Sequence, residues 1–455
     1  MPPEIIKKIA QAPATAAKRT LETSEKIVKS IGGEPIRKAE AYWQMLGPGL
    51  TTGAADDDPS GIATYSQTGA TYGFNLLWLA AWSFPLMAVV QEMCARIGLV
   101  TGRGLAGNIK RHYPKQVLYI VTALLFAANT FNIGADLGAM AKAAQLLLPG
   151  ADFTALIFFF TLVSLGLQIF LTYKDYAKYL KWLALVLLSY VLTAFAVNLH
   201  GSEIAWHAVL PSLSLDKNQI FLICGILGTT ISPYLFFWQT SQEVEERILE
   251  GKTSIKLRQA ETTDSEVRKM RVDIWSGMLF SNMAMFFIIL TCAATLNRAG
   301  ITNIQTAAEA AAALRPLAGN YAFLLFAIGI LGVGMLGVPV LAGSASYALS
   351  ESFGWKQGLY RKFRQAQAFY GVIILSMFIG LALNFIGLDP IKALIYSAVL
   401  NGIVAPVILV LIVDMSDNKK IMGRHKNGRM VSAIGWITTI LMIIAGVAAI
   451  ASMLI

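Results

Sequence analysis

The stretch that decides the fold is GPGLTTGAADDDPSGIATYS, residues 47–66. It places three consecutive carboxylates, at 56–58, in the middle of an apolar segment. A charge at bilayer depth costs about 2.5–3.5 kcal/mol on insertion scales, so such residues line cavities or ion pathways. Pro59 lacks a backbone N–H, and the nearby glycines loosen a helix further. We therefore predict a membrane helix that unwinds here and frees its carbonyl groups to bind a cation.

One alternative is that residues 56–58 form a surface loop between two short spans. Each half would then have to cross about 30 Å of hydrocarbon alone, and neither half is long enough. We therefore favour one interrupted helix.

The composition is that of an integral membrane protein. Of 455 residues, 56% are hydrophobic and only 14% are charged, whereas soluble domains carry about 25% charged residues. A soluble fold with one very large core would have too little polar surface to cover it. We therefore expect an all-α polytopic membrane protein and no enzyme motif.

Apolar windows of about twenty residues predict about eleven transmembrane helices. We place them at 45–71, 74–98, 116–147, 152–172, 180–200, 218–243, 272–296, 320–348, 366–387, 391–413 and 431–454. Three parts are expected from these spans: a basic, amphipathic cytosolic segment 1–43, a transport core 44–414, and a C-terminal part 415–455 that contains a cytosolic loop and the last helix. The transport core has two halves, 44–200 and 218–414, and a charged cytosolic helix or loop at 244–271.

The basic residues indicate the topology. If the N-terminus is cytosolic, nearly all of the 37 Lys and Arg fall on the cytosolic side of these spans, as the positive-inside rule requires. The net charge of +10 is therefore a topology signal, and we expect no nucleic-acid partner. We expect a prokaryotic plasma membrane, with the C-terminus outside.

The sixth span repeats the interruption. In FLICGILGTTISPYLFFWQTSQEVEE, residues 221–246, Pro233 follows the hydroxyl residues Thr229, Thr230 and Ser232. Secondary transporters built from two inverted repeats carry broken helices at corresponding positions that flank a midplane site. Pro233 alone would fit a packed proline kink, but breaks in spans one and six match two five-span repeats. An anionic Asp58 among freed carbonyls and hydroxyls is a hard, oxygen-rich cation site.

Several motifs resemble the NRAMP family of divalent-metal transporters, over nearly the whole chain beyond residue 40. They are residues 47–66 quoted above, QEMCARIGLVTGRGLA (91–106), the proline-containing sixth span, Asp273 with Asn282, and IMGRHKNG (421–428). The resemblance implies a LeuT-like inverted repeat (5+5) plus one extra helix.

The resemblance also implies a metal site, with departures. The family's metal-binding Asp corresponds to Asp58, its Asn to Gly61, its Ala carbonyl to Thr229 and its Met sulfur to Ser232. A thioether favours transition metals, so its loss favours a hard, partly hydrated ion. The sequence is therefore most similar to the NRAMP-related magnesium transporter branch.

Proton-handling positions also differ. The family's two histidines of span six correspond to Tyr234 and Gln239, and its glutamine of span ten corresponds to Ala398, with Asn401 nearby. Of the paired acidic residues in span three, Asp136 remains. A proton relay needs titratable groups along a path, so we expect weak or absent proton coupling.

Some roles stay open. Asp56 and Asp57 either form a vestibule that attracts cations or are solvated or helix-capping residues, and Asp136 is either functional or internally hydrogen-bonded. We expect Tyr234 to line the cavity.

The expected function is Mg²⁺ and Mn²⁺ transport by alternating access. The main alternative is a proton-coupled Mn²⁺/Fe²⁺ importer. An organic-solute carrier is disfavoured because three carboxylates would repel a substrate carboxylate. An intramembrane aspartyl protease would need Asp58 and Asp136 to share a proton. We expect no cofactor, with the metal ion as substrate, and lipid as the other partner; a monomer is compatible with the sequence.

Overall fold

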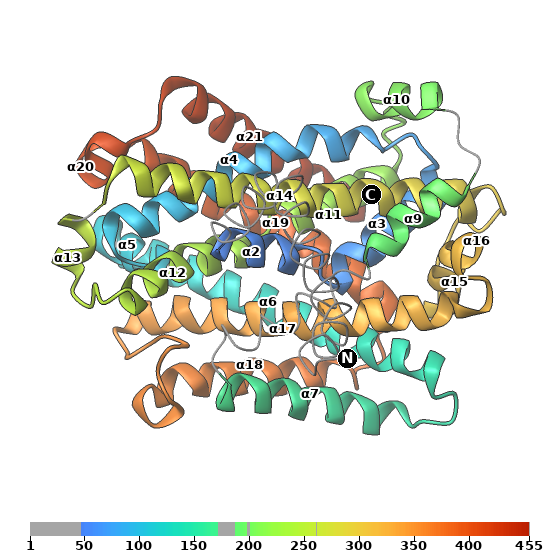
Figure 1. Ribbon diagram of the computed structural model, residues 1–455, viewed down its shortest axis with the longest axis horizontal. Helices are drawn as coiled ribbons and strands as arrows, with labels where there is room; N and C mark the ends of the chain where they lie inside the picture. The colour runs from blue at the N-terminus through green and yellow to red at the C-terminus, as the bar shows by residue number, and fades with distance from the viewer. Residues whose placement is uncertain (1–46, 172–186, 198–200, 261, 455) are drawn as a thin grey trace, which may run out of the picture. The chain divides into compact units, whose positions relative to one another are not determined.

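The computed structural model describes residues 47–171, 187–197, 201–260 and 262–454, and the regular structure there is entirely helical (Figure 1). The α-helices are α2 (Pro48–Asp56), α3 (Pro59–Tyr72), α4 (Trp78–Thr101), α5 (Leu105–His112), α6 (Lys115–Leu147), α7 (Phe153–Phe170), α9 (Leu188–Ala196), α10 (Gly201–Val209), α11 (Lys217–Thr230), α12 (Pro233–Leu249), α13 (Ile255–Ala260), α14 (Asp264–Cys292), α15 (Ala307–Ala311), α16 (Arg315–Ala318), α17 (Ala322–Phe353), α18 (Gln367–Leu383), α19 (Pro390–Asp417), α20 (Lys419–Met422) and α21 (Arg429–Leu454). The predicted cytosolic segment 1–43 lies outside the described residues.

The helices confirm a polytopic membrane protein. Within the described residues, 8 helical stretches are long and apolar enough to cross a membrane. The shorter α18 and the pair α2–α3 coincide with two further predicted spans. Of the predicted span 180–200 the structure describes residues 187–197, which contain the short helix α9, so the total of eleven stays a prediction.

Two helices are interrupted, each at a proline. The first breaks between α2, which ends at Asp56, and α3, which begins at Pro59. The second breaks between α11, which ends at Thr230, and α12, which begins at Pro233. Proline is favoured at the start of a helix because the N–H it lacks would have no helical partner there. Both interruptions lie where the sequence places them.

The first half of the broken helix, α2, packs closely on α14. A methyl group added at Gly53 would lie 2.2 Å from the Gly277 carbonyl oxygen, and one added at Gly277 would lie 2.1 Å from the Gly49 carbonyl oxygen. Gly49 and Gly53 are four residues apart, which is the small-residue spacing that brings membrane helices together. Only glycine, which has a hydrogen atom in place of a side chain, fits at these contacts.

The N-terminus of α2 is capped from the same neighbour. The Asp273 carboxylate of α14 accepts hydrogen bonds from the backbone N–H groups of Gly49, at 2.7 Å, and Leu50, at 3.2 Å. A carboxylate at this end satisfies unpaired N–H groups and complements the helix dipole. Asp273 therefore caps the N-terminus of α2 and also holds this helix against α14.

Long helices surround the two breaks. α6 packs against α17 and α19, and α19 also packs against α11 and α21. α4 packs against α12 and α14. In Figure 1, α17, α18 and α7 run nearly parallel to one another along one side of the bundle, and they contact each other. The breaks therefore lie among helices from both halves of the chain.

The segment 244–271 is helical over much of its length and combines exposed charges with a few buried ones. α12 continues to Leu249, α13 follows, and α14 already begins at Asp264. The Arg258 side chain is buried and donates from Nε to the Gly102 carbonyl oxygen at 3.1 Å, and Arg247 is also buried. These two arginines therefore anchor the segment on the fold, whereas most of its other charged side chains, among them Lys256, Arg268 and Lys269, are exposed.

The contact between α2 and α14 gives a first prediction. In Gly53→Ala the new methyl group would overlap the backbone of α14, so we expect destabilisation of about 1–3 kcal/mol from overpacking. Gly371→Ala in α18 is the matched control, since no atom lies within 4 Å of its added methyl group. Thermal unfolding of the two purified variants in detergent measures the difference. Equal melting temperatures would show that the close approach is not required.

Candidate cation site

Asp58 is a buried helix cap at the first break. Its side chain has 0% of its area exposed. Oδ1 accepts hydrogen bonds from the Ser60 hydroxyl, at 2.6 Å, and from the Gly61 backbone N–H, at 2.8 Å. The carboxylate therefore caps α3, where the helix dipole favours negative charge.

A second helix holds the other oxygen of Asp58. Asn132 of α6 donates from Nδ2 to Asp58 Oδ2 at 3.0 Å, and the Ser397 hydroxyl of α19 donates to Asn132 Oδ1 at 2.8 Å. Because its oxygen accepts from Ser397, the Asn132 amide presents its N–H group to the carboxylate. Three helices thus fix the orientation of Asp58.

The sequence interpretation missed Asn132, although a signal was present. Asn129, Asn132 and Asp136 follow at spacings of three and four in an apolar span, which places them on one face of the helix. Repeated polar residues on one face of a membrane helix indicate a buried polar environment.

Gly61 and Thr229 meet across the two breaks. A methyl group added at Gly61 would lie 3.0 Å from Thr229 Oγ1 and 3.4 Å from the Asp56 carbonyl oxygen. Thr229 Oγ1 and the nearby Tyr65 hydroxyl are buried, and neither makes a hydrogen bond of normal geometry within the described residues. Oxygen atoms from both broken helices therefore converge beside Asp58.

Ser232 is engaged with its own helix. Its hydroxyl donates to the carbonyl oxygens of Gly228, at 2.7 Å, and Thr229, at 2.6 Å. The Thr229 carbonyl, which the resemblance implies as a ligand, is thus hydrogen-bonded in this conformation. One of the two lone pairs of this carbonyl oxygen is thus used by Ser232.

Asp56 and Asp57 lie against α14. The Ser281 hydroxyl donates to Asp56 Oδ2, and it lies 3.4 Å from Asp57 Oδ1. Exposed fractions of 0% and 3% show that neither side chain is solvated in this conformation. The two carboxylates share one hydroxyl donor, and Asp56 Oδ1 has no partner among the described residues.

Tyr234 and Gln239 bind the first broken helix. The Tyr234 hydroxyl donates to the Ala55 carbonyl oxygen, one of those freed at the end of α2, at 3.0 Å. Gln239 accepts a hydrogen bond from the Thr52 hydroxyl and donates to Glu243 Oε1 at 2.9 Å. At the positions of the family's histidines, this chain therefore has groups that fasten α2 to α12.

Asp136 and Asn401 are buried polar residues with unused hydrogen-bonding capacity. Neither carboxylate oxygen of Asp136 and neither polar atom of the Asn401 amide has a hydrogen-bond partner in the part of the chain described. A methyl group added at Gly337 of α17 would lie 3.1 Å from Asp58 Cβ and 3.9 Å from Asp136 Oδ2. Asp58 and Asp136 therefore face the same glycine.

The acidic residues do not form a metal site by themselves. Across the described ranges, no three His, Cys, Asp or Glu side chains converge in a geometry that could hold a metal ion. A cation at Asp58 would therefore need carbonyl, hydroxyl, amide or water oxygens to complete its coordination.

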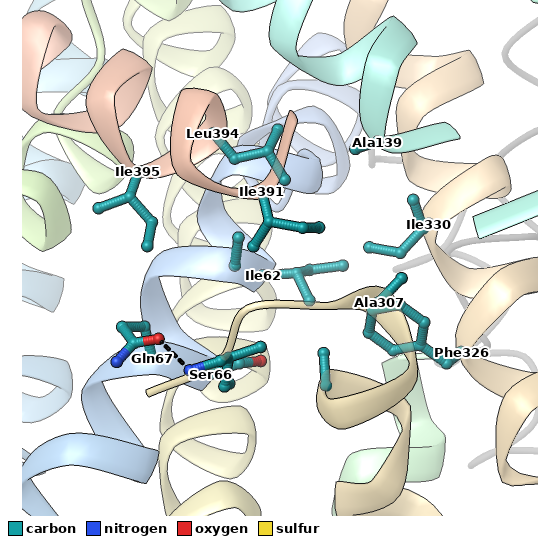
Figure 2. Close-up of a pocket in the computed structure, with 13 residues that line it drawn as sticks. Ile62, Ser66, Gln67, Ala139, Ala307, Phe326, Ile330, Ile391, Leu394 and Ile395 are labelled. Carbon is teal, nitrogen blue, oxygen red and sulfur yellow. Dashed lines mark hydrogen bonds between the residues drawn. The ribbon is translucent and has the colours of Figure 1, made fainter. Parts of the chain in front are cut away.

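A small apolar pocket of about 20 Å³ lies beside α3 (Figure 2). Ile62, Phe326, Ile330 and Leu394 line it. At its edge, Gln67 accepts a hydrogen bond from the Ile304 backbone N–H at 2.9 Å, the dashed line in the figure. Apart from Ser66 and Gln67 the lining is apolar, and no carboxylate borders the pocket.

Comparison with known proteins identifies the family. A family model described as "Natural resistance-associated macrophage protein-like" (Nramp) matches residues 49–452. The chain belongs to the Nramp family. Members are metal transporters, so this chain is a transporter and not an enzyme. The expected divalent-metal family is confirmed, whereas nothing in the match distinguishes the magnesium branch.

Solved structures show the same fold. A manganese transporter from Eremococcus coleocola has 19% sequence identity and a TM-score of 0.69, with 89% of this chain and 86% of that chain covered. MhsT in complex with L-phenylalanine has 13% identity and a TM-score of 0.56, with 90% and 97% covered. At these identities the likeness concerns the fold alone, and the LeuT-like architecture of this Nramp protein is confirmed.

Asn132 gives the second prediction. In Asn132→Ala, Asp58 loses a hydrogen bond to a charged group, worth about 1.5–3 kcal/mol, so we expect metal affinity to fall about tenfold or more. Asn129→Ala is the matched control, because Asn129 lies one turn away and donates to Leu341 and Ser344 instead. Titration calorimetry with Mn²⁺ measures both. Unchanged or tighter Mn²⁺ binding in Asn132→Ala would mean that Asn132 donates to the Asp58 carboxylate only when no metal is bound.

Proposed function

We propose that this Nramp protein transports hard divalent cations, Mg²⁺ and also Mn²⁺, by alternating access and with little or no proton coupling. The observation that supports the proposal most strongly is the surroundings of Asp58. Gly61, Thr229 and Asn132 place oxygen and amide groups around the carboxylate. Where the family is expected to carry a thioether, this chain has Ser232.

The sparse ligand set favours a hydrated ion. Mg²⁺ gives up its water reluctantly and is bound through few carboxylates and several retained waters. Gly61 carries no side chain at the position where the resemblance implies an asparagine ligand, and the described acidic residues form no closed metal cluster. A site with one well-held carboxylate and few other charged ligands suits such an ion.

One thioether does lie close to the break. A methyl group added at Gly334 would lie 2.6 Å from the Met140 sulfur and 3.3 Å from Pro59 Cγ. On α6, Met140 lies one helical turn beyond Asp136. We propose that it packs against α17, and the ion-selectivity experiment below includes it as a variant.

The proposal of weak proton coupling rests on the second broken helix. Tyr234 and Gln239 are hydrogen-bonded to α2, and neither is a group that titrates readily near neutral pH. Transport would then follow the membrane potential and the metal gradient. The cytosolic N-terminus, the external C-terminus and the prokaryotic plasma membrane are part of the same proposal.

A proton-coupled Mn²⁺/Fe²⁺ importer is the second candidate. It is favoured by the manganese transporter among the similar structures and by the buried carboxyl group of Asp136, which has no hydrogen-bond partner among the described residues. Internal pH distinguishes the candidates, because this one requires acidification of the vesicle lumen during metal uptake.

Uptake into proteoliposomes tests the function. We expect wild-type vesicles to take up both Mg²⁺ and Mn²⁺ without acidifying, and Asp58→Ala to abolish uptake of both. Asp152→Ala is the matched control, because Asp152 also caps a helix by accepting from a backbone N–H, that of Ala155, but does so at the start of α7. Uptake of Mn²⁺ but never Mg²⁺ would contradict the ion assignment, and metal-dependent acidification would contradict weak coupling.

Ion selectivity gives a further prediction. Ser232→Met introduces a soft ligand, so we expect Cd²⁺ to compete with Mn²⁺ at least tenfold more strongly than in the wild type. We expect Met140→Leu to leave weak Cd²⁺ competition unchanged. Strong Cd²⁺ competition in the wild type that Met140→Leu removes would show that Met140, rather than a set of oxygen atoms, determines selectivity.

A further inference from the structure

A second, larger cavity lies away from Asp58, where the end of α4, α5, the second half of α12 and the end of α17 meet. Its volume is about 470 Å³, within the range of small-molecule sites. Residues of α5, α12, α13 and α17 line it, together with the loops at 102–104, just after α4, and at 354–361. Nothing in the transport of a small cation at Asp58 accounts for a space of this size.

The cavity has an excess of positive charge. Five cationic side chains line it: Arg103, Lys110, Arg258, Lys356 and Arg361. The two carboxylates in the lining are Glu245 and Glu351. Within the described residues, no ion pair joins these cations to a carboxylate at salt-bridge distance.

Both carboxylates are already used by the fold. Glu351 accepts hydrogen bonds from the Gly107 backbone N–H, at 2.7 Å, and from Gln357 Nε2, at 2.9 Å. Glu245 accepts from the Leu359 backbone N–H at 2.7 Å and from the Tyr347 hydroxyl. Three of the cations also donate to backbone carbonyls: Arg258, Arg361 and Lys110. Among the described residues, the Arg103 and Lys356 side chains make no hydrogen bond or ion pair, so these two are the most available to an external anion.

Buried hydroxyl groups in the cavity wall also lack partners. Ser241 of α12 and Ser350 of α17 are 3% and 0% exposed, and neither hydroxyl has a hydrogen-bond partner among the described residues. Buried hydroxyls without partners are uncommon in folded proteins. They are suitable donors to an anionic oxygen atom.

Aromatic rings complete the lining. Trp355 and Tyr360 border the cavity, and the Arg361 guanidinium lies 4.8 Å from the centre of the Tyr360 ring. A base or another flat group can stack on such surfaces, while guanidinium and ammonium groups bind phosphate oxygens.

We propose that this cavity binds a phosphate-bearing anion, with a nucleoside polyphosphate as the class that best matches its size, charge and aromatic lining. The positive-inside rule accounts for cationic residues at these helix ends. It does not account for a cleft of this volume, unpartnered buried hydroxyls and aromatic rings at the same place.

The position of the cavity connects it to transport. α12 begins with Pro233 and Tyr234 at the second break, and α17 carries Gly337 beside Asp58. An anion that bridges α12, α17 and α5 would stabilise their present arrangement and slow any motion between them. The inference depends on neither the identity of the transported metal nor the presence of proton coupling.

Binding to the purified full-length protein tests the proposal, with metal chelated so that complexes of metal and nucleotide do not interfere. ATP, pyrophosphate and adenosine are titrated, and liposomes with and without phosphatidylglycerol test a lipid phosphate as the source. We expect saturable ATP binding, weaker pyrophosphate binding and no adenosine binding. Arg103→Gln/Lys356→Gln should raise the Kd for ATP at least tenfold.

Lys419→Gln/Lys420→Gln is the matched control, since it removes the same charge from α20, whose residues do not line the cavity. Because Arg103 is half-buried, Lys110→Gln/Lys356→Gln, at two exposed positions, is a second variant should the first fail to fold. Binding confined to phosphatidylglycerol and lost in the cavity variants would support a lipid phosphate as the ligand. Absence of binding, or equal weakening in the control, would overturn the proposal.

Discussion

A carboxylate buried in a membrane protein must be surrounded by donors, because an uncompensated charge there costs several kcal/mol. In this protein the constraint is met at Asp58 by donors from two directions: the start of α3, through Ser60 and Gly61, and Asn132 of α6. Asn132 is itself oriented by Ser397 of α19. The interruption of the first helix makes this possible, since an unbroken helix would leave no free N–H groups to cap the carboxylate.

The same arrangement keeps the two broken helices together. α2 is held at its start by Asp273, along its length by glycine contacts with α14, and at its end by Tyr234. Gln239 adds a contact from α12. These contacts satisfy polar groups that the break exposes. A transporter must exchange them for others during alternating access, so their number and strength bear on how readily α2 can move.

The sequence predicts the breaks well because their signals are local: charges followed by proline at 56–59, and hydroxyl residues followed by proline at 229–233. It does not predict Asn132 as the partner of Asp58 or Asp273 as the cap of α2, because both depend on which helix faces pack together. The sequence likewise does not predict that the Ser232 hydroxyl donates a hydrogen bond to the Thr229 carbonyl oxygen. The burial of Arg247 and Arg258 within the otherwise largely exposed charged segment also depends on tertiary contacts.

The central claim is that Asp58 binds a partly hydrated cation within a shell of oxygen atoms. Anomalous diffraction from crystals soaked in Mn²⁺ tests it most directly, because it locates the ion and shows its ligands. We expect one peak beside the Asp58 carboxylate, with oxygen atoms from the Thr229 region and ordered water completing the shell. A peak coordinated by the Met140 sulfur, or a peak elsewhere with none at Asp58, would contradict the account.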